Sequence, residues 1–108
     1  MELAFSTKKL REVCEIESRA IKALGQETAL ILRRRISDLR AADSVSELIS
    51  GGPRELVYLS QVAYSLNLKN SQRIIICPNH TLPAKLDIDT VDWKTISRVK
   101  VIEIEGVS

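Results

Sequence analysis

Arg73 is the residue of this sequence whose type and position best suit the binding of a phosphate group. It stands in "QRIIICPNH" (residues 72–80), directly before a run of apolar residues. Its planar guanidinium can fork onto a phosphate through two N–H groups, or form an ion pair with a carboxylate on a neighbouring strand. His80, the only histidine, has an ordinary pKa near neutrality. Along a straight strand it would lie roughly 23 Å from Arg73, which favours a loop role.

Three further side chains could act beside Arg73. Arg54 begins an expected strand, and opposite Arg73 in the sheet it would be a second cation for the phosphate. Lys69 lies at an expected hairpin tip, where it could follow a nucleic-acid backbone. Tyr64 could stack a base or donate a proton. Simpler structural roles stay open: a charged strand start, a solvated turn lysine and an aromatic residue on a strand face.

The sequence predicts neither a metal centre nor a cofactor. Asp87, Asp89 and Asp92 are loosely spaced, and no glycine marks the turn of a calcium loop. Cys14 and Cys77 lack the paired spacing of a zinc site. We expect both to be reduced, buried thiols that pack as small apolar side chains.

The elements that must position these residues begin with helices. A chain of 108 residues with 44% hydrophobic composition suffices for one compact core, so residues 1–108 are expected to form one domain. A short strand is expected at residues 3–6. Apolar residues at steps of three and four predict one helix from a Ser6 or Thr7 cap to Leu24, and a second over residues 26–42. Their short link implies an antiparallel helical hairpin, and residues 44–47 read as a capping box.

The second half of the chain has the period of β-strands. After Gly51, Gly52 and Pro53 the apolar period falls to about two. The expected strands cover residues 54–60, 63–69, 72–78 and 97–106, with residues 69–72 as a tight turn. Short links favour an antiparallel meander. The expected fold class is therefore α+β, with an N-terminal short strand and a helical hairpin packed on a three- to four-stranded antiparallel sheet.

Charge and composition limit the classes of function. The 16 basic and 14 acidic residues give a net charge of +2, so any site for a polyanion must be a local patch. Four aromatic residues disfavour broad stacking of bases. We find neither a signal-peptide pattern at the N-terminus nor 18 consecutive apolar residues, which predicts a cytoplasmic protein without a membrane span.

The chain resembles the RelE/ParE superfamily of bacterial toxins, and most closely its HigB-like "plasmid maintenance killer" branch. The likeness covers nearly the whole chain and rests on four segments: "FSTKKLREVCE" (5–15), "LGQETALILRRRISDLRAAD" (24–43), "YSLNLKNSQRIII" (64–76) and "VDWKTISRVKVIEI" (91–104). The resemblance implies a RelE-like fold.

The resemblance also implies an activity and partners. Members of this branch are toxins of toxin–antitoxin pairs, and many cut mRNA on the ribosome without a metal, the RNA 2′-hydroxyl attacking the neighbouring phosphate. Arg73 matches the family arginine that reaches this phosphate. Lys8, Lys9 and Arg11 on the first helix would then help to hold ribosomal RNA. The implied partners are the ribosome with its mRNA and a cognate antitoxin, often a helix-turn-helix protein.

Two segments depart from the family pattern. Where members often carry His-Pro-Leu-Lys-Gly-Asp, this chain has "RELVYL", which puts Arg54 in the place of the histidine and Val57 in that of the lysine. Where members tend to end in Asp-Tyr-His, this chain has "GVS" (106–108). These departures leave a second interpretation open, a non-catalytic binder: a ParE-like inhibitor of a topoisomerase or a toxin whose nuclease has decayed. A third is a purely structural interaction domain.

Overall fold

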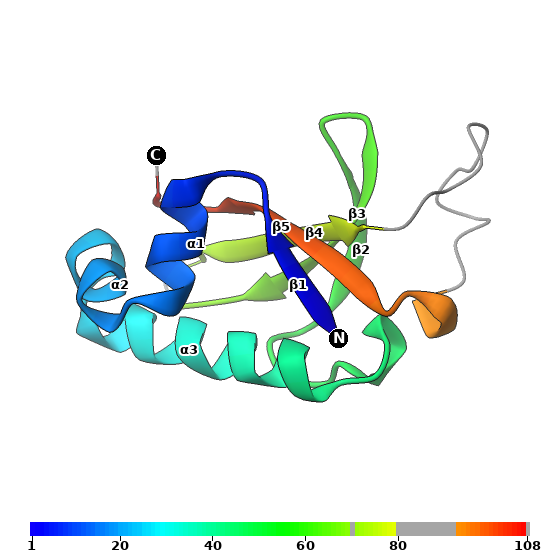
Figure 1. Ribbon diagram of the computed structural model, residues 1–108, viewed down its shortest axis with the longest axis horizontal. Helices are drawn as coiled ribbons and strands as arrows, with labels where there is room; N and C mark the ends of the chain where they lie inside the picture. Colours follow the sequence, from blue (N-terminus) through cyan, green and yellow to red (C-terminus); the bar gives the residue numbers. More distant parts are fainter. Residues whose placement is uncertain (70, 80–92, 108) are drawn as a thin grey trace.

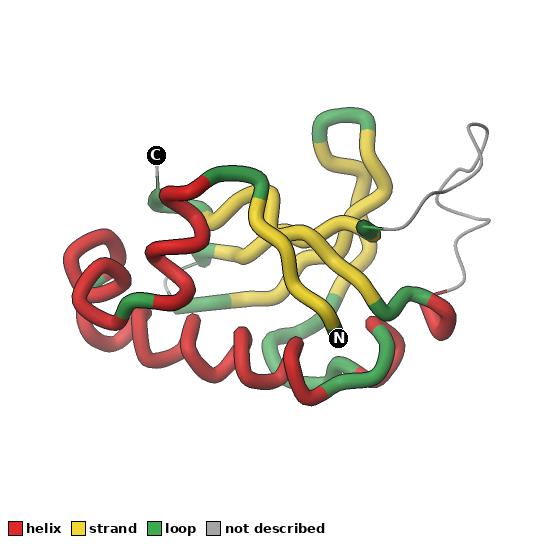
Figure 2. The backbone as a smooth tube through the Cα atoms, viewed as in Figure 1, coloured by secondary structure: helices red, strands yellow, loops and turns green. Residues whose placement is uncertain are grey.

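The computed structural model describes residues 1–69, 71–79 and 93–107 and confirms the α+β class. Figures 1 and 2 show a twisted sheet with the helices gathered along one side. The elements are β1 (Glu2–Phe5), α1 (Lys8–Glu15), α2 (Glu17–Leu24), α3 (Gln26–Ala41), η1 (Val45–Glu47), β2 (Arg54–Tyr58), β3 (Gln61–Asn67), β4 (Arg73–Pro78), η3 (Trp93–Thr95) and β5 (Arg98–Ile104).

The sheet differs from the expected one in both strand count and direction. It has five strands in the order β1-β5-β4-β3-β2, and β1 pairs with β5 in parallel, with Leu3 opposite Val99 and Phe5 opposite Val101. The expected three- to four-stranded antiparallel sheet is therefore wrong in these two respects. Only the meander from β2 to β4 follows from short links, because the pairing of β1 joins segments at the two ends of the sequence.

The hairpin of β2 and β3 turns two residues earlier than expected, at residues 59–60 in place of 61–62. Tyr58 pairs with Gln61, so the turn consists of Leu59 and Ser60 alone, with φ angles of 48° and 64°. Two successive residues at positive φ are typical of a type I′ turn, which matches the twist of the strands. Figure 1 shows this hairpin projecting from the sheet. The hydrogen bond from Gln72 N to Lys69 O agrees with the expected turn at residues 69–72, of which residue 70 lies outside the described part of the chain.

The first expected helix is in fact two helices. Ile16 has extended backbone angles (φ −114°, ψ 110°), ends α1 and begins α2. The apolar spacing continues across this break, so a pattern of three- and four-residue steps does not reveal it. Because α1 and α2 then take different directions, the expected antiparallel hairpin is replaced by three helices (Figure 2).

The other helical predictions are confirmed. The apolar stripe of α3 is buried as expected, at Ala29, Leu32, Ile36 and Leu39. The N-terminus of α1 is capped by Thr7, whose Oγ1 accepts a hydrogen bond from Leu10 N at 3.1 Å. The capping box of η1 is present, with Ser44 N donating to Glu47 Oε2 at 3.2 Å.

The core lies between the helices and one face of the sheet. Leu10, Leu32 and Leu39 from the helices pack with alternate residues of the central strands, such as Ile74 and Ile76 of β4. Successive side chains of a strand point to opposite faces, so Arg73, Ile75 and Cys77 lie on the other face of β4. We call this second face the Arg73 face. None of the described helices is long and apolar enough to span a bilayer.

Candidate functional site

Arg73 forms a two-point ion pair with Glu105 on the Arg73 face. Its Nε donates to Glu105 Oε1 at 3.0 Å and one Nη to Oε2 at 3.1 Å. The side chains are 37% and 34% exposed, respectively. Of the two interpretations of Arg73, the ion pair with a neighbouring carboxylate is the one seen in the structure. The pair uses two of the five guanidinium donors.

The backbone of Glu105 is held by two hydrogen bonds. Glu105 N donates to Arg73 O at 2.9 Å, and Gln72 Nε2 donates to Glu105 O at 3.0 Å. Gly106 follows at φ +91°, and a Cβ added there would lie 1.9 Å from Gln72 Nε2. Because Gly106 has no side chain, the Gln72 amide has space to donate its hydrogen bond to Glu105 O. The carboxylate of Glu105 therefore projects from a main chain that is held at both its N–H and its C=O.

A second polar pair lies on the same face. Tyr58 of β2 donates its hydroxyl to Glu103 of β5, although β3 and β4 lie between these strands. A flat sheet would separate β2 from β5 by about 14 Å, so the sheet must curl toward this face for the bond to form. Because the sheet curls, residues on the Arg73 face are buried although the helices pack on the opposite face. Ala63 and Ile75 are both 0% exposed.

Tyr58, Arg73, Glu103 and Glu105 form one electrostatic group, the Arg73 cluster. The hydrogen bond to Glu103 is the main cause that raises the pKa of Tyr58, with further contributions from burial and both carboxylates, while Arg73 opposes them. The hydrogen bond with Arg73 is the main cause that lowers the pKa of Glu105, and the same bond raises the pKa of Arg73. At neutral pH the cluster therefore contains a cation, a charged carboxylate and a protonated phenol.

Arg54 does not lie opposite Arg73. In the register of the sheet Arg54 faces Ser65 and Arg73 faces Asn67, so β3 separates the two arginines. Both belong to the Arg73 face, because cross-strand partners share a face. The expected direct pairing of two cations on adjacent strands is wrong, and Arg54 is an exposed residue of the edge strand.

Tyr64 and Lys69 are engaged away from the Arg73 cluster. Tyr64 faces Ile76 across the strands and therefore lies on the helix-covered face, where its ring packs 4.9 Å from that of Trp93. Burial, followed by the charge of Glu55, raises its pKa. Lys69 forms an ion pair with Glu27 at the start of α3. The structure does not bring either residue to Arg73.

The three basic residues of α1 lie at one end of the sheet. Lys8 pairs with Glu12 at 3.9 Å, Arg11 stacks its guanidinium 5.6 Å above the Phe5 ring, and Lys9 is exposed. Figure 1 shows α1 near the end of β5, the strand that leads into Glu105. These three cations and the Arg73–Glu105 pair therefore lie at the same end of the sheet.

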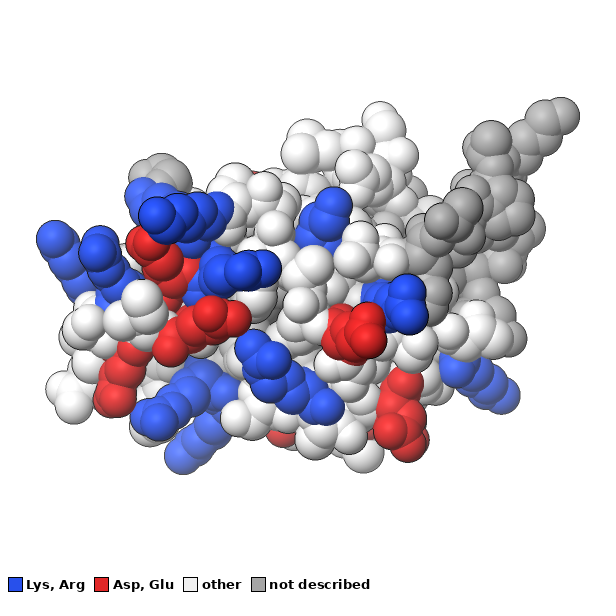
Figure 3. All heavy atoms as spheres, in the orientation of Figure 1, with Lys and Arg blue, Asp and Glu red and all other residues white. Residues whose placement is uncertain are grey.

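Acidic and basic side chains are mixed over the helices. Figure 3 shows blue and red groups alternating on this face. Arg33 pairs with Glu17 at 3.5 Å and Arg40 with Glu15 at 3.7 Å. Such pairs weaken a positive field, so the helical face is not a continuous basic surface.

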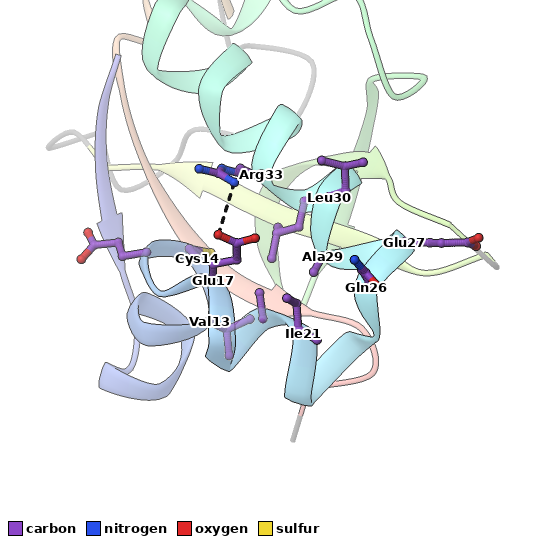
Figure 4. Close-up of a pocket in the computed structure, with 12 residues that line it drawn as sticks. Val13, Cys14, Glu17, Ile21, Gln26, Glu27, Ala29, Leu30 and Arg33 are labelled. Carbon is purple, nitrogen blue, oxygen red and sulfur yellow. Dashed lines mark ion pairs between the residues drawn. The ribbon is translucent and has the colours of Figure 1, made fainter.

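A groove lies between the helices beside this surface. It has a volume of about 360 Å³ and apolar walls that include Val13, Ala20, Ile21, Ala29 and Leu30. In Figure 4 the Glu17–Arg33 ion pair lies across it.

The groove also contains the thiol of Cys14. Burial, reinforced by Glu15 and opposed by Arg40, raises the pKa of Cys14 to about 12. The thiol is therefore protonated at neutral pH, whereas the thiolate is the reactive form. Both cysteines are free thiols. We expected both to be buried, and Cys77 is, whereas Cys14 is only half-buried.

The remaining candidate residues fall outside the described part of the chain. His80, Asp87, Asp89 and Asp92 belong to residues 80–92. Among the described residues, no group of three or more histidine, cysteine, aspartate and glutamate side chains could hold a metal ion.

Sequence reasoning missed Glu103 and Glu105 as site residues. In "VIEIE" (101–105) both alternate with apolar residues, of which Val101 and Ile104 are part of the core. Because β4 and β5 are antiparallel, with Ile75 opposite Glu103, the next pair in register brings Glu105 to Arg73. The signal was therefore present in the alternation of the last strand, but it required knowledge of which strand pairs with β4.

Comparisons with protein-family models, with curated proteins and with solved structures found no match to this chain.

Proposed function

We propose that this protein is the toxin of a type II toxin–antitoxin pair and cleaves mRNA on the translating ribosome without a metal. The observation that carries this proposal is the Arg73 cluster, which combines a guanidinium, two carboxylates and a phenol on one sheet face. Attack of an RNA 2′-hydroxyl on the adjacent phosphate needs a cation for the developing charge and a group that accepts a proton. The resemblance to HigB-like toxins points to the same activity.

Two further proposals accompany the activity. The α+β arrangement of the chain is a RelE-like fold, in which the open sheet face receives the RNA and the cations of α1 contact ribosomal RNA. The toxin acts in the cytoplasm and is neutralised by a cognate antitoxin, a helix-turn-helix protein in many such pairs, that covers the Arg73 face.

Induction in a bacterial host, followed by mapping of mRNA 5′ ends, tests the activity. We expect growth arrest with new 5′ ends inside codons. Arg73→Ala should abolish both effects, whereas Arg40→Ala, which removes an arginine from the surface pair with Glu15, should leave them unchanged. Equal cleavage by the Arg73→Ala variant would refute the assigned phosphate contact.

A non-catalytic toxin is the second candidate, favoured by a separate observation. Two of the expected RNA-binding cations are already paired with carboxylates, Arg73 with Glu105 and Lys69 with Glu27. A ParE-like inhibitor of a topoisomerase would need no phosphate chemistry at these positions. Growth arrest with intact mRNA and with DNA damage in the same induction experiment would favour this candidate and reject the ribonuclease.

A further inference from the structure

The Arg73–Glu105 pair has the geometry of an arginine bound to a phosphate. Glu105 places both carboxylate oxygens on the guanidinium, at 3.0 and 3.1 Å. A phosphate would use two oxygens in the same way. About a third of each side chain is exposed, so an incoming ligand can reach the pair. Exposed ion pairs are weak enough for such an exchange.

Of the two carboxylates in the Arg73 cluster, Glu105 is the one that a phosphate can displace from Arg73. Glu103 already accepts the hydrogen bond of Tyr58, whose phenol bridges from the far edge of the sheet. The main chain of Glu105 is held by Arg73 O and by Gln72 Nε2. When a phosphate takes its place, rotation of the side chain therefore leaves the carboxylate close to whatever is bound on Arg73.

We propose that Glu105 is exchanged for the scissile phosphate on Arg73 and then serves as the general base of the cleavage. In the free protein it occupies the phosphate position and orients the guanidinium. In the complex it lies beside the 2′-hydroxyl of the bound RNA, with no loop or domain movement needed to bring it there. This inference rests on the ribonuclease function proposed above and names the group that accepts the proton.

The Glu105 carboxylate takes the proton of the 2′-hydroxyl as the O2′–P bond forms. The P–O5′ bond breaks, and the leaving oxygen takes a proton from water. The hydroxide so formed recovers the proton from Glu105. The products are a 2′,3′-cyclic phosphate and a 5′-hydroxyl, and the enzyme returns to its starting state.

Binding and cleavage should respond in opposite directions to Glu105→Gln. The neutral amide holds Arg73 less strongly, so a 2′-O-methyl RNA oligonucleotide, which lacks the attacking hydroxyl, should bind about two- to fivefold more tightly. Loss of the general base should slow cleavage of ribosome-bound mRNA about 10²- to 10⁴-fold. Glu15→Gln removes the same charge from the surface pair with Arg40 and should change neither quantity to this extent.

A third measurement separates proton transfer from mere positioning. Glu105→Ala should regain cleavage in proportion to added acetate, because the free carboxylate can enter the space left by the side chain. Acetate should not rescue Arg73→Ala. A thermal unfolding curve verifies folding of each variant. If Glu105→Gln does not fold, Glu105→Asp replaces it. The aspartate keeps the charge but is one methylene too short to accept both hydrogen bonds from Arg73, so this variant should cleave mRNA more slowly than the wild type.

The outcomes distinguish this inference from the proposed function. If the wild-type protein leaves ribosome-bound mRNA intact, both the proposed ribonuclease activity and the general-base role of Glu105 are refuted. Cleavage by the wild type together with undiminished cleavage by Glu105→Gln refutes only the role of Glu105. The exchange is overturned if Glu105→Gln binds the oligonucleotide no more tightly than Glu15→Gln, and the base role if acetate has no effect on Glu105→Ala.

Discussion

Gly106 should be the most sensitive glycine of the chain, because a side chain there meets both a conformational and a steric obstacle. Its φ of +91° costs an alanine about 1–2 kcal/mol. The added Cβ would also lie 1.9 Å from Gln72 Nε2. Since this atom is the end of a flexible side chain, the amide swings away and loses its hydrogen bond to Glu105 O, which costs about 1 kcal/mol.

We therefore expect Gly106→Ala to lower the free energy of unfolding by about 2–3 kcal/mol, or roughly 8–12 °C in unfolding temperature. Urea unfolding followed by circular dichroism measures the change.

A double-mutant cycle isolates the contact with Gln72. Gln72→Ala alone should cost about 1 kcal/mol, but it should cost almost nothing in the Gly106→Ala background, where the same hydrogen bond is already lost. The reasoning is refuted if the effects of Gln72→Ala and Gly106→Ala simply add.

Three further predictions concern the Arg73 cluster and the hairpin. The phenol of Tyr58 should titrate above pH 10 in an absorbance titration, and Glu103→Gln should bring its pKa down, because the hydrogen bond to Glu103 is the main cause of the shift. The lowered pKa of Glu105 stabilises the fold above its ordinary value of 4.5, and this contribution is lost as the pH falls through the folded-state pKa. Glu105→Gln should therefore show a weaker decline in thermal unfolding temperature below pH 4.5. Leu59→Asn with Ser60→Gly should raise the free energy of unfolding by about 1 kcal/mol in urea, since both positions have positive φ.

The helices were largely predictable because their determinants are local. The stripe of α3 and the capping box at Ser44 follow from spacings of three and four residues, and both are present. The break at Ile16 is different. Helical spacing continues through it although Ile16 is extended, so no local pattern of apolar residues records the break.

The site was predictable only in part, for a related reason. Arg73 was found from its position at the start of a strand, and a carboxylate partner was one of two interpretations of it. The identity of Glu105 required the pairing of β4 with β5, and the distance between Arg54 and Arg73 required the register of β3. Alternation shows which side chains share a face of one strand, but not which strands are neighbours.

The parallel pairing of β1 with β5 has a consequence for how the chain folds during synthesis. Ser6, just beyond β1, hydrogen-bonds the carbonyl of Ile102 across 96 positions of sequence. While the protein is being translated, β1 has no strand to pair with, and the central strand β4 has one open edge until β5 leaves the ribosome. Such long-range pairing folds slowly and leaves apolar surface exposed to aggregation. The Glu105 end of β5 follows β1 to β4 in the sequence, so the Arg73 cluster cannot assemble before β5 has been synthesised.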